Sequence, residues 1–407
     1  MAHAALPASV PSVTPLKSDR FDAQFIKHPD QHLVAYVLDG IRHGFRVAFD
    51  GSSALLSSKK NKQSAQEHPS VVDDYLANEV SLGRVAGPFA YPPFPNLHIS
   101  KSGVIPKSGQ PGKWRLIVGL SSPEGASVND GIDPEQFTLN YIRVDDIIKM
   151  IDKFSPGASI AKFDVMSAYR NVPVHPSDRY LLGMRWRAHY YVDLAWPFGL
   201  RSAPYIFNTV ASMVEWILVN NHQVSDIMNY LDDFILAGPP DSPRCARDLS
   251  VALQVCTNLG LPLHPGKCGG PSSTLTVLGI ELDLVNRVAR LPADKLANLR
   301  ALINKWSRLD CCIRHDLESL IGHLHHAAKV VWPGQPFIRR LIDQLRCFRH
   351  DRHPIRINNE TRHDMAWWQQ FLESWNSVSF WLYPGLEATP TVGILSTATW
   401  ALGFQTT

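Results

Sequence analysis

The sequence predicts a protein of the α+β class, in which strands and helices are mixed without a regular βαβ repeat. Two short apolar runs of strand length, residues 159–164 and 227–236, are interrupted by carboxylates. Apolar residues recur at helical spacing over residues 203–220, where Pro204 stands in a position that a first helical turn tolerates. After Leu291 the pattern becomes one of long helices, so we expect a mainly helical region there.

Length and composition exclude several protein classes. With 407 residues, 45% of them hydrophobic and 19% charged, the chain can bury the core of two or three structural units and is not a disordered protein. Its six cysteines contain no C-x-x-C pair, so we expect reduced thiols rather than a disulfide framework. No signal peptide and no apolar run of membrane length is present, which predicts an intracellular protein without a membrane partner, in the cytoplasm or the nucleus.

The N-terminal quarter is predicted to hold an arm, a helix and an extended connector. Residues 1–32 are rich in Ala, Pro, Ser and Val and predict a flexible arm, which residues 33–97 follow as an N-terminal extension. Within the extension, residues 52–70 predict a loop, and residues 71–83 carry apolar side chains at helical spacing. Residues 87–97 contain four prolines, which exclude a helix or a central strand and predict the connector.

A hairpin with a basic tip is predicted next, because the β-prone residues 104–105 and 114–118 flank the turn sequence K-S-G-Q-P-G. Its G-Q-P-G-K segment is not a Walker phosphate-binding loop, which needs an earlier glycine and a Ser or Thr where Trp114 stands. An ATPase is therefore excluded. The cations of the hairpin could close over a triphosphate or could be solvated surface charges. They are Lys107, Lys113 and Arg115.

Three carboxylates stand in the two short apolar runs. Asp164 ends the first run, and the pair Asp232 and Asp233 lies inside the second, in the context Y-L-D-D-F. Adjacent carboxylates between apolar flanks are costly to bury unless charged partners or metal ions offset them. A solvated hairpin turn is the alternative, and the neighbouring motifs decide between the two interpretations.

The C-terminal helical region is basic. Residues 287–356 contain fourteen Lys or Arg against six Asp or Glu, a local charge of +8, whereas the whole chain carries +3. A basic helical unit suits a surface that grips nucleic-acid phosphates, and a generally solvated helix face is the alternative. No cysteine pair stands at ligand spacing near the histidines of this region, so no zinc site is predicted. These histidines are His323, His325, His326, His350 and His353.

Three stretches in the middle of the chain resemble, in order and spacing, the palm motifs of reverse transcriptases. They are KFDVMSAYRNVPVHP (residues 162–176), PFGLRSAPYIFN (197–208) and YLDDF (230–234). The likeness continues on both sides.

Further motifs widen the resemblance to reverse transcriptases. PKSGQPGKWRLI (106–117) resembles their fingers hairpin, LPLHPGKCGG (261–270) their motif with a late lysine, and VLGIELD (277–283) their primer grip. Together with LSSPEGASVNDGI (120–132), these motifs resemble the Gypsy-like and, more closely, the DIRS-like retroelement enzymes. Six ordered motifs are far more specific than any single short motif.

The resemblance implies the right-hand polymerase fold of fingers, palm and thumb, with an antiparallel palm sheet. It implies fingers and palm over residues 98–285 and a mainly helical thumb or connection over residues 286–384. Residues 385–407 would then be a partial ribonuclease H-like start.

The resemblance also implies RNA-directed DNA polymerase activity, a nucleotidyl transfer assisted by two divalent ions, Mg²⁺ or Mn²⁺. Asp164 and Asp232 match the two metal ligands, and the backbone carbonyl of Val165 is expected to add a ligand. Asp233 either ligates as well or tunes the electric field of the site.

Other implied roles concern the nucleotide and the primer. Tyr169 matches the gate that excludes a 2′-hydroxyl, with a core tyrosine as the alternative, and Phe198 and Gly199 match nucleotide contacts. Lys267 matches the lysine that protonates pyrophosphate, a role that would need a lowered pKa, with a surface lysine as the alternative. The implied template and primer contacts are Arg201, Tyr230, Leu278, Gly279 and Ile280.

Two positions depart from the family pattern. Gly119 stands where members often carry aspartate, and Thr397 stands where a ribonuclease H would carry its first metal-binding aspartate. Ribonuclease H activity is therefore not expected. The sequence predicts an RNA-directed DNA polymerase, one piece of a retroelement polyprotein, with template, primer and deoxynucleoside triphosphates as partners. A catalytically weak, nucleic-acid-binding remnant of a degenerate retroelement is the alternative.

Overall fold

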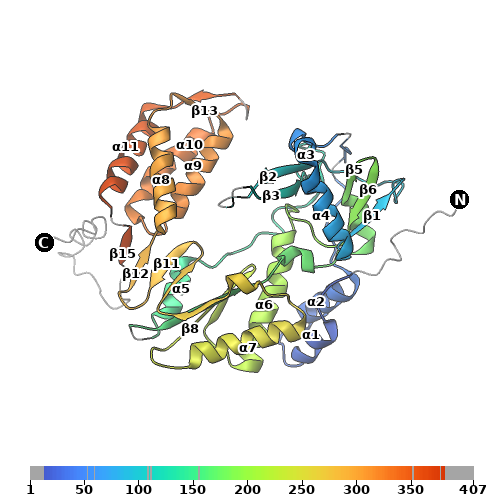
Figure 1. The fold of residues 1–407 in the computed structure, drawn as a ribbon, viewed down its shortest axis with the longest axis horizontal. Coiled ribbons are helices and arrows are strands. Elements are labelled where there is room, and N and C mark those ends of the chain that lie inside the picture. Colours follow the sequence, from blue (N-terminus) through green and yellow to red (C-terminus); the bar gives the residue numbers. More distant parts are fainter. Residues whose placement is uncertain are drawn as a thin grey trace. The chain divides into compact units, whose positions relative to one another are not determined.

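The computed structural model describes residues 13–380, except residues 53, 59, 108, 109, 111, 155, 351, 352 and 376. The chain divides into two compact units and crosses between them several times, as the colours in Figure 1 allow the reader to follow. The first unit comprises Met1–Ile142, Lys162–Phe234 and Arg247–Cys268, and the second comprises Arg143–Ala161, Ile235–Ala246 and Gly269–Thr407.

The first unit holds the predicted mixture of helices and strands. Its helices are α1 (Ser18–Gln24), α2 (Gln31–His43), α3 (Gln63–Glu67), α4 (Pro69–Ser81), α6 (Ala203–His222) and most of α7 (Arg244–Leu259). Its strands are β1 (Val85–Phe89), β2 (Ser102–Pro106), β3 (Trp114–Val118), β5 (Gly183–Trp186), β6 (His189–Asp193) and β7 (Ile227–Tyr230), with parts of β4 (Ser159–Asp164) and β8 (Asp233–Gly238).

The predicted hairpin is confirmed as the antiparallel pair β2 and β3. Its register sets Val104 opposite Leu116 and Pro106 opposite Trp114. Val104 and Leu116 are buried in a core cluster with residues of α3, α4 and β5. Helix α3 lies in the stretch predicted to be a loop, because burial of Ala65 in this cluster outweighs the polar sequence around it.

The proline-rich connector is only partly what the sequence predicts. Its first residues belong to β1, which pairs with β6 so that Val85 lies opposite Asp193. The three-stranded sheet has the order β1-β6-β5, so β1 is an edge strand. An edge strand tolerates Pro88, because a proline lacks only the donor that would point away from the sheet.

The second part of the predicted flexible arm is ordered in the structure. Helix α1 lies within it, and Phe21 and Phe25 are buried, with the Phe25 ring 6.5 Å from the ring of Trp216 in α6. Two buried aromatic side chains four residues apart are enough to fix a short helix whose composition favours disorder. Residues 1–12 of the arm lie outside the described residues.

The run over residues 227–236 is not one strand. It forms β7 and β8, separated by a tight turn at Leu231, whose φ is 54°. Within the first unit, β8 lies between β7 and β4. The carboxylate pair therefore lies at a hairpin turn, beside the end of β4, and this turn is the feature that the apolar run conceals in the sequence.

The second unit confirms the predicted helical region. Its helices are α5 (Val144–Ile151), α8 (Ala293–Trp306), α9 (Arg314–Ala327), α10 (Pro336–Leu345) and α11 (Asn359–Ser374). Its strands are β9 (Gly269–Ser272), β10 (Thr274–Val277), β11 (Ile280–Asp283), β12 (Val288–Arg290), β13 (Cys311–Cys312), β14 (Ile355–Arg356) and β15 (Val378–Phe380).

Apolar residues predicted at helical spacing form the core of this second unit. Leu296, Leu299 and Ile303 of α8 are buried, as are Leu317 and Leu324 of α9. Strands β10, β11, β12 and β15 form an antiparallel sheet in that order. The mixture of helices and antiparallel sheets confirms the predicted α+β class.

Two further predictions concern the C-terminal end and the membrane. The expected ribonuclease H-like start over residues 385–407 lies outside the described residues. Among the helices that the structure describes, none is long and apolar enough to span a bilayer. The predicted boundaries of fingers, palm and thumb stay predictions.

Candidate active site

Asp164 ends β4 and is the most deeply buried of the three carboxylates. Its exposed fraction is 3%. Beside it, the rings of Phe163 and Phe234 stack at 4.8 Å, which ties β4 to β8. The backbone N–H of Val165 donates to the carbonyl of Asp232 at 2.9 Å. These contacts hold the hairpin turn against the end of β4, so residues 68 positions apart in the sequence form one site.

Burial and neighbouring carboxylates raise the pKa values of Asp232 and Asp233. Burial, and then the charge of Asp164, raises the pKa of Asp232. Burial, followed by the charges of Asp232 and Asp164, raises the pKa of Asp233 to about 6. A group of partly buried, mutually repelling carboxylates is stabilised in its charged form by cations, which makes it a candidate for metal binding.

Lys267 and Lys162 are protein cations near the aspartates, and Lys267 is hydrogen-bonded to one of them. Lys267 ends the short 3₁₀ helix Pro265–Lys267, and its Nζ donates to Asp164 Oδ2 at 2.7 Å. Partial burial lowers the pKa of Lys267, but the hydrogen bond to Asp164 and the charges of the aspartates outweigh it and raise the pKa. The pKa thus moves opposite to the direction that a general acid would need, and Lys267 is an exposed lysine whose amine is paired with Asp164.

The donor set suits a hard cation such as Mg²⁺, which prefers oxygen ligands. In the described part of the chain, no three His, Cys, Asp or Glu side chains are gathered into a complete metal cage. Mg²⁺ is commonly held by one or two carboxylates and completes its shell with water and substrate phosphates. Asp164 and Asp232 match that incomplete kind of site.

Tyr169 lies close to the carboxylates and faces two phenylalanines. Its ring centroid is 5.2 Å from that of Phe198 and 5.8 Å from that of Phe207. Burial, and then the charge of Asp232, raises the pKa of Tyr169 to about 12, so the phenol stays neutral. Tyr169 is half-buried rather than a core residue, and its neighbour Phe198 is 52% exposed.

A buried ion-pair network fixes the backbone that carries Tyr169. The next residue, Arg170, donates from Nε to Glu79 at 2.8 Å and from Nη1 to Asp193 at 2.7 Å. Burial would lower the pKa of Arg170, but the surrounding acidic groups raise it. The network links the 3₁₀ turn Ala168–Asn171 to α4 and β6, so the position of the tyrosine depends on two other elements.

The turn after Phe198 is held by Asn129, a residue that the sequence reasoning missed. Asn129 is 4% exposed, its Nδ2 donates to the carbonyl of Gly199 at 2.8 Å, and its Oδ1 accepts from the N–H of Arg201 at 2.8 Å. Gly199 has a φ of 92°, which favours glycine. The only signal in the sequence is the polar pattern S-V-N-D-G, which does not reveal a partner 70 residues away.

The predicted template contact Arg201 is partly engaged within the protein. Its Nη1 donates to the carbonyl of Ile132 at 2.8 Å, while the residue remains exposed. Tyr230 packs against Tyr141, with ring centroids 5.1 Å apart, just before the turn that carries Asp232. Tyr141 is a second residue near the site that the sequence reasoning did not select.

The three hairpin cations are free of ion pairs in the described part of the chain. Lys113 and Arg115 are exposed and Lys107 is half-buried. The N–H of Lys107 donates to the carbonyl of Lys113 at 2.8 Å, which closes the base of the tip. No described hydrogen bond joins these cations to the three aspartates.

The predicted primer grip lies in the second unit, at the turn between β10 and β11. Leu278 and Gly279 have φ values of 46° and 77°. Lys295 Nζ donates to the carbonyl of Gly279 at 3.1 Å and lies 3.4 Å from His326 Nε2. A Cβ at position 279 would lie 2.1 Å from that Nζ, which is the mobile end of a lysine, so it is the positive φ that favours glycine here.

Comparisons with known proteins agree with these features. Residues 105–282 match the family model described as reverse transcriptase (RNA-dependent DNA polymerase). A search of the curated proteins finds no match to the sequence.

Solved structures with a similar fold include three foamy viral protease–reverse transcriptases. One, in complex with an RNA/DNA hybrid, has a TM-score of 0.57 at 12% identity and covers 87% of this chain and 46% of its own. A second, named dRH and in complex with ds DNA, has a TM-score of 0.57 at 13% identity. The match covers 91% of this chain and 62% of that structure's chain. A third, in complex with dsDNA, has a TM-score of 0.56 at 13% identity and covers 93% and 75%.

This chain therefore spans about half to two thirds of the length of the first two structures. At these identities the likeness concerns the fold, and it confirms the predicted polymerase fold. The matched residues 105–282 contain Asp164 at the end of β4 and Asp232 and Asp233 at the β7–β8 turn. Residues 105–282 thus match the reverse transcriptase family model, and the chain has a fold similar to that of the foamy viral reverse transcriptases.

Proposed function

We propose that this protein is an RNA-directed DNA polymerase of a retroelement, which adds deoxynucleotides to the 3′ end of a primer. The observation that carries the proposal is the convergence of Asp164 with the Asp232–Asp233 turn beside Tyr169. A primer terminus, a triphosphate and their counter-ions need such an anionic centre next to a surface that reads the sugar.

The residues that would hold two divalent ions, Mg²⁺ or Mn²⁺, are Asp164, Asp232 and the carbonyl of Val165. Bound there, the ions would supply Lewis-acid stabilisation of the charge on the attacking and leaving oxygens. Asp233 has its pKa raised to about 6, which is consistent with a role in the field of the site as well as with ligation.

The protein's own side chains would orient the nucleotide. Tyr169 would exclude a 2′-hydroxyl, and Phe198 and Gly199 would contact the base and sugar from the turn that Asn129 holds. Lys267 carries a proton at Nζ beside Asp164 and would deliver it to the departing pyrophosphate once Asp164 is engaged elsewhere. Lys107, Lys113 and Arg115 would oppose the charge of the triphosphate.

The proposed partners are an RNA or DNA template, a primer and deoxynucleoside triphosphates. Support comes from the similar structures, which are of proteins in complex with an RNA/DNA hybrid and with dsDNA. The proposed template and primer contacts are Arg201, Tyr230, Leu278, Gly279 and Ile280. The origin we propose is a DIRS-like or Gypsy-like element whose polyprotein supplies further partners.

Primer extension on poly-rA/oligo-dT with Mg²⁺ tests the proposal. Replacing Asp232 with Asn removes one negative charge from the metal site. We expect Asp232→Asn to reduce extension by more than about a hundredfold, because metal-ligand carboxylates contribute several kcal/mol to such reactions. The matched control is Asp74→Asn, which alters an exposed carboxylate of α4 and should leave the rate unchanged.

Two results would count against the proposal. Primer extension that survives Asp232→Asn would contradict the assignment of Asp232 as a metal ligand. Template-primer binding by the unaltered protein without any extension would instead favour a nucleic-acid-binding remnant.

A further inference from the structure

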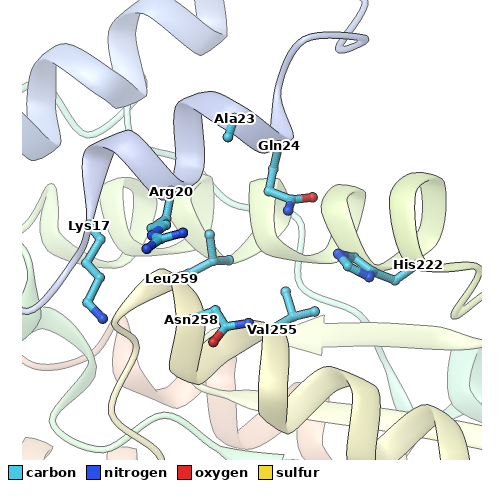
Figure 2. Close-up of a pocket in the computed structure, with 8 residues that line it drawn as sticks. All are labelled: Lys17, Arg20, Ala23, Gln24, His222, Val255, Asn258 and Leu259. Carbon is cyan, nitrogen blue, oxygen red and sulfur yellow. The ribbon is translucent and has the colours of Figure 1, made fainter.

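A pocket in the first unit is lined by none of the residues assigned to polymerisation. It has a volume of about 260 Å³ and is lined by α1, by the last residue of α6 and by the last turn of α7 (Figure 2). Its floor is apolar and consists of Val255 and Leu259, both nearly fully buried. The polar groups around this floor decide what the pocket can bind.

Two cations stand on the α1 side of the pocket. Lys17 and Arg20 are both exposed, and Figure 2 shows their charged ends turned toward the α7 side. The nearest acid to Arg20 is its neighbour Asp19, with Oδ2 3.8 Å from Arg20 Nε. Lys17 has no ion pair in the part of the chain that the structure describes. Most of this positive charge is thus available to a ligand.

The two amides at the pocket present donors. Asn221 Nδ2 donates both to the backbone carbonyl of Gln24 at 2.7 Å and to its Oε1 at 2.9 Å. The Oε1 of Gln24 is thereby engaged, and Nε2 is left to face the pocket, as Figure 2 shows. On the α7 side, Asn258 Oδ1 accepts from Gln254 Nε2 at 3.0 Å, which likewise leaves the Asn258 Nδ2 as a donor.

His222 supplies the fifth polar group. Its Nε2 is shielded from solvent and has no hydrogen-bond partner among the described residues. A shielded ring nitrogen without a partner is costly, and a ligand atom in the pocket would relieve that cost. In its Nε2–H form, or when protonated, His222 donates as the other four groups do.

Two backbone carbonyls at the end of α7 are already engaged. The carbonyl of Leu259 accepts from the N–H of Lys17 at 2.9 Å, and that of Thr257 accepts from Gly260 at 3.1 Å. No carboxylate lines the pocket. Two cations, two amide N–H₂ groups and one imidazole therefore line this space.

We propose that this pocket is a binding site for a phosphate group, with Arg20 and Lys17 as its charged ligands. A phosphate group presents mainly acceptor oxygens and a negative charge at neutral pH, so it suits a set of donors, and charge-assisted hydrogen bonds from arginine favour it. The volume admits a phosphate together with an attached sugar. The phosphate would belong to a free nucleotide or to a nucleic-acid backbone. The site is independent of whether the chain polymerises DNA.

Titration of the full-length protein followed by NMR of its labelled histidine side chains tests the proposal. The buffer contains EDTA, so that divalent ions at the aspartates do not contribute. The His222 resonances are identified by their loss in His222→Gln. The probes are inorganic phosphate, a nucleoside 5′-monophosphate and a single-stranded oligonucleotide without terminal phosphates.

We expect a saturable shift of the His222 resonances and at least about a tenfold weaker dissociation constant in Arg20→Gln and Lys17→Gln. The matched control is Lys27→Gln, an exposed cation just after α1 that does not line the pocket, which should bind as the unaltered protein does. Saturation by the small probes identifies a free-nucleotide site, and saturation by the oligonucleotide alone identifies a backbone site. No saturable shift with any probe, or equal weakening in Lys27→Gln, overturns the proposal.

Discussion

Tyr169 is the residue at which sugar selection would be decided. Its ring is held between Phe198 and Phe207 and so cannot turn away freely from an incoming nucleotide. Its hydroxyl stays neutral because burial and the charge of Asp232 raise the pKa to about 12. Sterics rather than charge would therefore discriminate between sugars.

Tyr169→Ala should admit ribonucleotides. We expect the ratio of kcat/KM for a deoxynucleotide to that for the ribonucleotide to fall by at least about tenfold, the size of effect that pocket volume produces in enzyme specificity. Single-nucleotide incorporation kinetics with dTTP and UTP measure this ratio. Tyr141→Ala, which alters another half-exposed tyrosine near the site, serves as the control, and an unchanged ratio in Tyr169→Ala would rule out the gate.

Between elements of the fold, Asn129 joins the segment over residues 120–132 to the turn that carries Phe198 and Gly199. Removing its amide leaves the N–H of Arg201 and the carbonyl of Gly199 without that partner. We expect Asn129→Ala to lower kcat/KM for the nucleotide about 10- to 100-fold, as loss of a positioning hydrogen bond does.

The control for Asn129→Ala is Asn61→Ala, because the Asn61 side chain also bonds to one backbone carbonyl and one backbone N–H. Asn61 donates to the carbonyl of Arg185 at 2.8 Å and accepts from the N–H of Ser102 at 2.9 Å. Asn61→Ala should cost similar stability, measured by urea unfolding, without the loss of kcat/KM. Equal kinetic losses in both variants would reduce Asn129 to a purely structural role.

Glu215, which joins α6 to β7, makes the stability of the fold depend on pH. Its Oε2 accepts from the N–H of Asn229 at 2.8 Å, and burial raises the pKa of its carboxyl from 4.5 to about 7 despite that hydrogen bond. Between these pH values the folded state binds more protons than the unfolded state, so the free energy of unfolding falls as pH rises. The loss has an upper bound of about 3 kcal/mol.

Glu215→Gln should remove this part of the pH dependence, since an amide does not ionise. Urea unfolding at pH 4.5 and pH 7.5 measures it. The variant should lose less stability than the unaltered protein over that interval. The same pH dependence in both proteins would show that Glu215 is not the group responsible.

On the scale of the whole molecule, the basic stretch over residues 287–356 divides into two kinds of residue. Several of its arginines form ion pairs within the protein, such as Arg287 with Asp152 at 2.9 Å and Arg340 with Asp364. Other cations have no acidic partner in the described residues. These are Lys295, Lys305, Arg308, Lys329, Arg349 and Arg356. The local charge of +8 thus overstates what is available to a nucleic acid.

Lys295 and Lys329 are the clearest candidates for phosphate contacts. Burial, and then the charge of Lys295, lowers the pKa of Lys329, so the two ammonium groups repel each other and would gain from an anion between them. We expect the double variant Lys295→Gln/Lys329→Gln to reduce the slope of log K against log salt by about two, because each lost phosphate contact removes about 0.9.

Fluorescence anisotropy of a labelled template-primer at several KCl concentrations measures this slope. The control is Arg339→Gln, because Arg339 already pairs with Asp343 at 3.4 Å. Its slope should stay close to that of the unaltered protein. A double variant with an unchanged slope would contradict phosphate contact by these lysines.

Sequence patterns predicted the hairpin β2–β3, helix α6, strand β4 and the helices of the second unit, because each follows from the local spacing of apolar residues. They missed helix α1 and strand β1, where contacts with Trp216 and with β6 outweigh local composition. They offered the turn at Leu231 only as an alternative, since an apolar run of ten residues gives no sign of a positive φ.

By itself the sequence determined the chemistry of the three aspartates and their order along the chain, because residue type and apolar flanks are local properties. Only the tertiary structure decided what lies beside them. Lys267 reaches Asp164 across 103 positions, and Asn129 reaches Gly199 across 70. A hydrogen bond forms only at about 3 Å, so these partners depend on how the elements pack, and no spacing in the sequence encodes that distance.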